Sequence, residues 1–387
     1  MDAADVSGLA RELMSLTPII LCHFERKKLL LITKKIHARP IGGRELLCRL
    51  NERVLKALLG GRFNKFEIDD GSDSFFDKAI GALRGQVDGV DSAKISQIVQ
   101  FIQEENASQV FIDGSNLGSI SRALKKHSPG LEVITFYHNV ETRFFLGALR
   151  RDRTPKALAV LLGNYLAERA ATRFSDKRIC LNERDSFVLK KFFGRTATHI
   201  SSMAIDRPVL SAGKSTSEVP HDDYTLFVGG NFYANLAGIE WFGKFISPHF
   251  SLPLYVVGRG YDQVREKLEI PGKIIMVGSV DDLNEWYRKS KFIVAPIFDG
   301  SGMKTKVAEA LMYGKKIVGT PEAFVGYEAT LPHAGWCCRS PEDFLNACKT
   351  AEREDSDSVN EALIEIYEEN YSFTAVQRRF SEILVAI

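Results

Sequence analysis

Apolar residues along the chain fall into two alternating kinds of segment. Short continuous apolar runs, such as residues 29–32 and 292–294, predict strands that are buried on both faces. Between them lie longer segments in which apolar residues recur every three or four positions, as in amphipathic helices. This alternation predicts an α/β fold with doubly wound parallel sheets.

The predicted elements cover most of the chain. The predicted strands are residues 29–32, 63–68, 109–112, 132–137, 178–181, 225–228, 254–258, 274–278 and 292–294. The predicted helices are residues 6–16, 46–58, 75–83, 92–104, 155–170, 187–192, 236–245, 283–288, 307–311 and 373–384. A polar, turn-rich stretch, residues 211–223, interrupts the alternation. We therefore predict a first domain of residues 1–206, a linker of residues 207–223 and a second domain of residues 224–370.

A glycine-rich turn lies between a strand and a helix in the second half. Gly300 and Gly302 let an anion approach the backbone, and the free N–H groups of the first helical turn point toward it. Lys304 and Lys306 add positive charge, and Glu309 could accept hydrogen bonds from sugar hydroxyls. An ordinary turn with solvated lysines is the alternative.

Two features of the first half also suggest binding of an anion and a sugar. Gly42 and Gly43 stand at a strand-to-helix junction, where a backbone anion site can form and where a plain tight turn is the alternative. His138 follows a predicted strand, and the carboxyl ends of parallel strands line the crevice of such sheets. Its imidazole could donate to a sugar hydroxyl or stabilise developing charge, whereas a structural histidine is the alternative.

The second half carries a longer motif, G-x-G-x-x-x-K-x-x-E-A followed by G and T, formed by Gly300, Gly302, Lys306, Glu309, Ala310, Gly314 and Thr320. It resembles the donor-binding segment of retaining GT-B glycosyltransferases of the glycosyltransferase family 4 type, the glycosyl transferases group 1. The spacing of F-V-G-G, N-x-x-x-I-E-W-F, V-V-G, V-G-S-V and A-P resembles the bacterial polysaccharide-biosynthesis branch. This resemblance implies two Rossmann-like domains facing across a cleft, with a C-terminal helix, residues 371–387, crossing back to the first domain.

The resemblance also implies roles for site residues. It implies that Glu309 binds the donor ribose, that Lys306 faces the diphosphate, that His138 lies beside the transferred sugar, and that Gly42 and Gly43 contact the donor phosphates. His138, Lys306 and Glu309 are therefore the predicted catalytic residues. The other predicted donor-binding residues are Gly229, Gly230, Asn231, Arg259, Val277, Gly278, Gly300, Ser301, Gly302, Met303 and Lys304.

Two departures from the family pattern concern the donor. Ser301 stands where many members carry a glutamate near the transferred sugar. Gly230 and Asn235 stand where members carry an arginine and a lysine. Positive charge is therefore expected from Lys304, Lys306 and Arg259 instead.

The implied function is transfer of a sugar, of the hexosyl type, from a nucleoside diphosphate sugar with retention of anomeric configuration. The expected acceptor is a growing glycan or a lipid-linked saccharide. No cofactor and no metal are expected, because helix N-termini and lysine can neutralise the leaving diphosphate. A nucleotide-sugar epimerase of GT-B fold and a non-catalytic GT-B partner protein are the alternatives. The donor base and sugar cannot be read from the sequence.

Charge is distributed unevenly. Residues 1–210 hold 33 Lys and Arg against 24 Asp and Glu, and the remainder holds 18 against 25. A basic first half favours an anionic acceptor or peripheral contact with an anionic membrane, with a merely solvated surface as the alternative. No nucleic-acid partner is expected.

Compartment follows from cysteines and hydropathy. The six cysteines show no paired C-x-x-C spacing, so neither a zinc site nor a disulfide framework is indicated, and free buried thiols are expected. The longest uncharged run near the start, residues 13–24, contains Pro18 and is shorter than the roughly 20 residues needed to span a bilayer. We expect a cytoplasmic protein without a secretory leader, associated with the inner face of the membrane if the basic half binds lipid.

Overall fold

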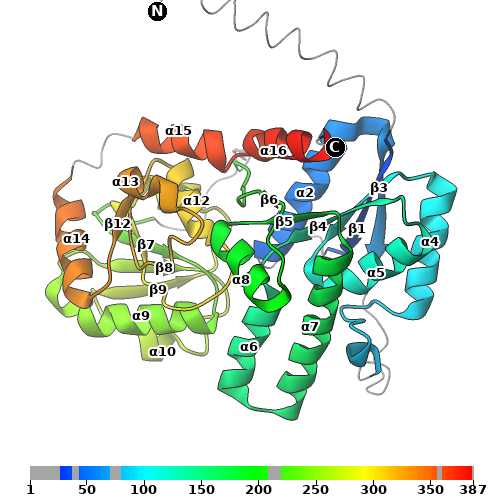
Figure 1. The fold of residues 1–387 in the computed structure, drawn as a ribbon. Coiled ribbons are helices and arrows are strands. Elements are labelled where there is room, and N and C mark those ends of the chain that lie inside the picture. Colours follow the sequence, from blue (N-terminus) through cyan, green and yellow to red (C-terminus); the bar gives the residue numbers. More distant parts are fainter. Residues whose placement is uncertain (1–26, 37–42, 70–79, 208–218, 355–359, 386–387) are drawn as a thin grey trace, which may run out of the picture. The chain divides into compact units, whose positions relative to one another are not determined.

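The computed structural model describes residues 27–36, 43–69, 80–207, 219–354 and 360–385. The chain divides into two compact units, coloured mostly blue to green and green to orange in Figure 1. Unit 1 contains Met1–Ser201 and Gln377–Ile387, and unit 2 contains Ser202–Val376. The predicted helix 6–16 and most of the predicted helix 75–83 lie outside the described residues.

Unit 1 is built on a six-stranded parallel sheet of order β2-β1-β3-β4-β5-β6. Leu29 to Ile32 are completely buried, as expected for a central strand covered on both faces. The strands are β1 (Leu29–Lys34), β2 (Phe63–Ile68), β3 (Gln109–Asp113), β4 (Glu132–Tyr137), β5 (Lys177–Cys180) and β6 (His199–Ile200). The helices are α2 (Gly43–Leu59), α4 (Ser92–Glu105), α5 (Gly118–His127), α6 (Glu141–Asp152), α7 (Pro155–Phe174) and α8 (Glu183–Phe193).

Helices α6 and α7 form an antiparallel pair (Figure 1). Helix α7 begins where the sequence predicts, because Thr154 Oγ1 accepts a hydrogen bond from Ala157 N at 3.1 Å and Pro155 occupies the first turn. Helices α5 and α6 were absent from the sequence-based prediction. Segment Gly118–His127 has only two large apolar residues, Ile120 and Leu124, which are too few to identify a helix from the sequence.

Unit 2 repeats the architecture with strand order β12-β11-β10-β7-β8-β9, again parallel throughout. Its strands are β7 (Thr225–Val228), β8 (Leu254–Val257), β9 (Ile274–Gly278), β10 (Phe292–Ala295), β11 (Ile317–Gly319) and β12 (Gly335–Cys337). Its helices are α9 (Tyr233–Phe245), α10 (Arg265–Leu268), α11 (Asn284–Lys289), α12 (Thr305–Met312), α13 (Leu331–Ala334), α14 (Pro341–Arg353) and α15 (Glu361–Asn370). The two Rossmann-like sheets confirm the predicted fold class.

The last helix, α16 (Phe373–Val385), returns to unit 1. Phe380 packs against Phe111 and Phe136 of the first sheet, with ring centroids 5.5 and 6.1 Å away. Lys177 Nζ donates to Ile383 O at 2.6 Å, and Gln109 Nε2 donates to Leu384 O at 3.3 Å. The predicted crossing of the C-terminal helix onto the first domain is therefore confirmed.

Candidate active site

The glycine-rich turn of unit 2 lies at the point where the strand order of its sheet reverses, between β10 and β7. Ligands of doubly wound sheets bind beyond the carboxyl ends of the strands at such a point. Gly300 and Gly302 have φ values of +137° and +63°, which a side chain would strain. Helix α12 starts at Thr305 directly after this turn, so the N–H groups of Thr305 and Lys306 have no partner within the helix, whereas Val307 N donates to Lys304 O at 3.1 Å. The strand, turn and helix predicted from sequence are all present.

Lys306 is a buried cation. It is only 6% exposed, its Nζ donates to Asn235 Oδ1 at 3.1 Å, and the same Nζ lies 3.8 Å from the centre of the Phe227 ring. Burial lowers its pKa to about 7, with Lys304 acting in the same direction and Glu309 opposing it. An anion arriving beside Nζ would stabilise the charged form.

Glycine at position 229 leaves room for the contact between Lys306 and Asn235. A Cβ at Gly229 would lie 2.7 Å from Asn235 Nδ2 and 3.2 Å from Lys306 Nζ. Asn235 Nδ2 donates to Gly230 O at 2.8 Å, so Asn235 connects the turn after β7 to the lysine of α12. Asn235, a departure from the family pattern, thus has a structural role in holding Lys306.

Glu309 lies one turn further along α12 and is half-buried. Tyr287 Oη donates to its Oε2 at 2.6 Å, and the Tyr287 ring stacks on Tyr313 with centroids 4.9 Å apart. Burial raises the pKa of Glu309, while Tyr287 and Lys306 oppose that rise. Among the described residues Oε1 has no hydrogen-bond partner, which leaves this oxygen for ligand hydroxyls. Tyr287 was not predicted from the sequence, because nothing in its local pattern distinguishes it from a core aromatic residue.

The remaining predicted donor residues occupy turns at the same edge of the sheet. Lys304 Nζ is paired with Glu322 Oε1 at 3.0 Å, so its charge is largely compensated within the protein. Asn231 N donates to Arg259 O at 2.8 Å, and Arg259 is an exposed residue. Met303 is buried and its sulfur accepts from Met203 N at 3.4 Å, whereas Ser301 and Val277 are partly exposed. Gly278 has φ +87° and accepts from Gly258 N at 2.8 Å.

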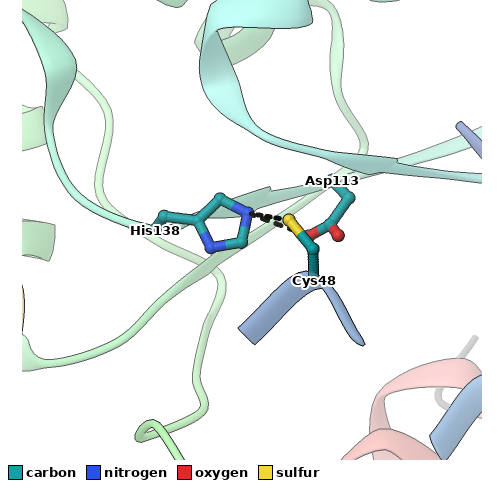
Figure 2. Close-up of side chains that lie close together, drawn as sticks. All are labelled: Cys48, Asp113 and His138. Atoms are coloured by element: carbon teal, nitrogen blue, oxygen red, sulfur yellow. Dashed lines mark hydrogen bonds and ion pairs between the residues drawn. The ribbon is translucent and has the colours of Figure 1, made fainter. Parts of the chain in front are cut away.

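His138 lies in unit 1 at the carboxyl end of β4, as predicted, and it is 5% exposed. Its Nε2 lies 3.0 Å from Asp113 Oδ1 and 3.5 Å from Cys48 Sγ (Figure 2). The nearby imidazole lowers the pKa of Asp113 against the opposing effect of burial, whereas burial raises the pKa of the Cys48 thiol. Nδ1 of His138 is buried and has no hydrogen-bond partner in the described part of the chain. Because Asp113 holds Nε2, Nδ1 is the nitrogen left for a ligand.

The buried polar groups around His138 were not predicted from the sequence. Glu168 of α7 accepts from the backbone N–H groups of Glu141 and Thr142 at 3.0 and 2.9 Å, which fixes the start of α6. Burial raises the pKa of Glu141 to about 7, with Arg44 opposing this. Asp113 follows a predicted strand as His138 does, so its position after an apolar run was a usable signal. Glu168 lies in a helix far from any motif, and no sequence signal singled it out.

Gly43 opens α2 and is exposed, whereas Gly42 lies outside the described residues. Of the described cysteines, Cys48, Cys180, Cys338 and Cys348 are buried free thiols. Cys337 is exposed, which corrects the expectation that the thiols are buried. It lies on β12, the edge strand of the second sheet, where only one side is covered by a neighbouring strand.

Two doubly wound parallel units, with a glycine-rich turn at the switch point of the second, define a GT-B type fold. Residues 222–353, which lie in unit 2, match the family model Glycosyl transferases group 1. Together with the fold, this match supports a nucleotide-sugar-dependent glycosyltransferase. No match was found among curated proteins.

Solved structures share the fold over nearly the whole chain. Anabaena HepE in complex with UDP and glucose matches with a TM-score of 0.63 at 12% identity, covering 94% of this chain and 100% of that one. Sucrose-phosphate synthase from Thermosynechococcus elongatus gives 0.69 at 12% identity, with coverages of 93% and 98%. The lipopolysaccharide outer core galactosyltransferase WaaB, in its apo form, gives 0.59 at 11% identity, with coverages of 92% and 99%. At these identities the similarity concerns the fold.

Proposed function

We propose that this protein transfers a hexosyl group from a nucleoside diphosphate sugar to a growing glycan or lipid-linked saccharide, with retention of anomeric configuration. The observation that carries the proposal is the buried Lys306 amino group at the switch point of unit 2. Its pKa of about 7 and its position on the first turn of α12 suit it to a diphosphate.

Each predicted catalytic residue has a role in this proposal. The N–H groups at the start of α12, with Lys306, bind the diphosphate and stabilise the charge that develops as it leaves. Glu309, held by Tyr287, accepts hydrogen bonds from the donor ribose. His138 acts on the transferred sugar through Nδ1, because Nε2 is held by Asp113. No metal is needed at the diphosphate.

Retention in this proposal does not use a protein nucleophile. The carboxyls nearest His138 are engaged or partly protonated: Asp113 is bound to the imidazole, and Glu141 has a pKa of about 7. The leaving phosphate itself takes the acceptor proton on the face from which it departs, so the new bond forms on that face.

A nucleotide-binding screen tests the donor part directly. UDP, GDP and ADP are titrated separately by calorimetry in the presence of EDTA, with UDP first because the HepE complexes contain UDP and UDP-glucose. We expect one of the three to bind, and the Lys306→Ala variant to bind it more weakly. Absence of binding by all three would overturn the proposal.

Product analysis separates transfer from the alternatives. The wild-type protein is incubated with the sugar form of the bound nucleotide, in water and with an acceptor, and nucleoside diphosphate release is followed. Release indicates a transferase. An isomerised nucleotide sugar without transfer would indicate an epimerase, and binding without any turnover would indicate a non-catalytic partner protein.

Glu309→Gln is expected to keep the fold and weaken donor binding by about 1 to 3 kcal/mol, the contribution of a hydrogen bond to a charged group. The neutral amide keeps the shape but accepts ribose hydroxyls less strongly. Calorimetric titration of the nucleotide measures the change.

Tyr287→Phe is the matched variant, since it removes the hydroxyl that donates to Glu309 Oε2 and leaves the ring stacked on Tyr313. We expect a smaller loss of affinity than for Glu309→Gln. Donor affinity unchanged in Glu309→Gln would remove Glu309 from the site.

The basic end of the α6–α7 pair is the surface we propose for contact with an anionic membrane at the cytoplasmic face. Arg150, Arg153 and Lys156 are exposed there, and Leu158 is 55% exposed. No helix within the described residues is long and apolar enough to cross a bilayer. Membrane association would therefore rest on surface charge and apolar side chains of this kind.

Sedimentation with vesicles containing phosphatidylserine tests this surface. We expect binding that falls steeply with ionic strength, because each basic residue near an anionic surface contributes about 1 kcal/mol. Arg150→Ala with Arg153→Ala should weaken binding roughly 30-fold at low salt, the equivalent of about 2 kcal/mol. The control, Lys190→Ala with Lys191→Ala on α8, should bind as the wild type does. Salt-insensitive binding, or none, would favour an acceptor in solution.

A further inference from the structure

Three side chains of different chemistry converge at the carboxyl edge of the first sheet (Figure 2). Cys48 comes from α2, Asp113 from the end of β3 and His138 from the end of β4. Their thiol, carboxylate and imidazole atoms all lie within 4.8 Å of one another, and all three residues are buried. The donor site in unit 2 does not use Cys48, and the proposed mechanism gives it no task.

The geometry excludes a nucleophilic thiol relay. In a cysteine-histidine-aspartate relay, the thiol and the carboxylate bind different nitrogens of the imidazole, so that a proton passes through the ring. Here both Cys48 Sγ and Asp113 Oδ1 lie beside the same nitrogen, His138 Nε2, at 3.5 and 3.0 Å. The three atoms instead surround a common point.

Atoms grouped in this way fit a tetrahedral metal ion. With bonds of about 2.0 to 2.3 Å, the ligand atoms of a tetrahedral zinc ion lie about 3.3 to 3.8 Å apart. The distances of 3.0 and 3.5 Å at Nε2 are within a few tenths of an ångström of that range. Thiolate and imidazole together select zinc over the hard cations magnesium and calcium. We propose that Cys48, Asp113 and His138 bind one zinc ion.

The charges of the three ligands favour a zinc ion at this buried position. On binding, the Cys48 thiol gives up its proton to solvent, and His138 binds through the lone pair of Nε2 and carries its proton on Nδ1. Thiolate and carboxylate then supply two negative charges against the two positive charges of zinc, so the centre is neutral. A neutral centre avoids the cost of burying an unpaired ion.

The carboxylate ligand is already oriented by its neighbours. Asn51 Nδ2 donates to Asp113 Oδ1 at 2.9 Å, and Thr33 Oγ1 donates to Asp113 Oδ2 at 3.4 Å. Such contacts behind a ligand are common in zinc sites and strengthen metal binding. Three protein ligands also match the number found in zinc sites that keep one position open.

Zinc binding would change the hydrogen-bonding role of His138 Nδ1. When Asp113 accepts the Nε2 proton of the neutral imidazole, Nδ1 is an acceptor. When zinc occupies Nε2, the proton must reside on Nδ1, which becomes a donor. This consequence concerns the proposed sugar contact, but zinc binding itself does not depend on the proposed function.

The test measures zinc and cobalt binding by the full-length protein. To exclude metal binding by thiols outside the proposed site, Cys22 and the exposed Cys337 are both changed to serine. We expect one equivalent of zinc to be taken from a chromophoric chelator, and cobalt to give tetrahedral visible bands with a thiolate charge-transfer band. Cys48→Ser should abolish that band and weaken zinc binding more than about 100-fold, and Asn51→Ala should weaken it about 10- to 100-fold.

Cys180→Ser is the matched control, because Cys180 is a fully buried free thiol of the same unit, on β5. It should leave both the spectrum and the affinity unchanged. The proposal is overturned if the parent protein takes up no zinc, if cobalt gives no thiolate band, or if Cys180→Ser weakens binding as much as Cys48→Ser does. The cobalt spectrum of the parent protein tests the proposal by itself, so poor folding of a variant does not prevent the test. Nucleotide binding in unit 2 is measured separately, so failure of one proposal is distinguishable from failure of the other.

Discussion

Lys306→Ala is expected to lower kcat about 10²- to 10³-fold while leaving the KM for the acceptor nearly unchanged. The lysine acts on negative charge that develops as the diphosphate leaves, so its removal costs more in the transition state than in the bound ground state. Steady-state kinetics with both substrates varied provide the measurement.

The neighbouring lysine is the control. Lys304 is on the same turn, but Glu322 already compensates its charge at 3.0 Å, so Lys304→Ala should reduce kcat far less. Equal losses in the two variants would mean that general positive charge, and not the buried amino group, matters. A loss confined to acceptor KM in Lys306→Ala would contradict its proposed role.

The pKa of Lys306 also predicts how donor binding depends on pH. At about 7 in the free protein, this pKa should rise when a diphosphate binds beside Nζ, because an anion favours the charged amine. Binding then takes up a proton above pH 7, and donor affinity falls as pH rises from 7 toward the pKa of the complex. Calorimetry of nucleotide binding at pH 8 in buffers of different ionisation enthalpy measures the proton uptake. Lys306→Met should remove it, and persistent uptake in that variant would assign the proton to another group.

His138→Ala is expected to lower turnover by about 10² without a comparable change in nucleotide affinity, because it removes a side chain that positions the transferred sugar. Its Nδ1 is the unpartnered nitrogen, whereas Nε2 is engaged by Asp113. Turnover and nucleotide affinity are measured on the same preparation. His127→Ala, at the exposed end of α5, is the control and should behave as the wild type.

The stereochemistry of the product tests the proposed mechanism as a whole. Proton NMR coupling constants of the newly formed glycoside should show the anomeric configuration of the donor. An inverted product would show that the diphosphate leaves and the acceptor attacks on opposite faces of the sugar. It would exclude the proposed roles of Lys306 and His138 in a retaining reaction.

The sequence alone determined the order and kind of most elements. The runs at 63–68, 132–137 and 274–278 coincide with β2, β4 and β9, because buried strands and amphipathic helices produce short-range patterns. It also determined the glycine positions at 300 and 302, where the backbone has positive φ. Helix α5, which has only two large apolar residues, was missed, and so was α6.

Tertiary structure decided which side chains meet. Asn235 and Lys306 are 71 residues apart and bond only because β7 and β10 are neighbours in the second sheet. Cys48 and His138 are 90 residues apart, so a spacing-based search for metal ligands could not pair them. Strand order and register bring such residues together, and both are set by the packing of the whole sheet. Hydrophobic periodicity reports only on neighbours along the chain, which is why it gave the elements and the loops that carry the site but not its contacts.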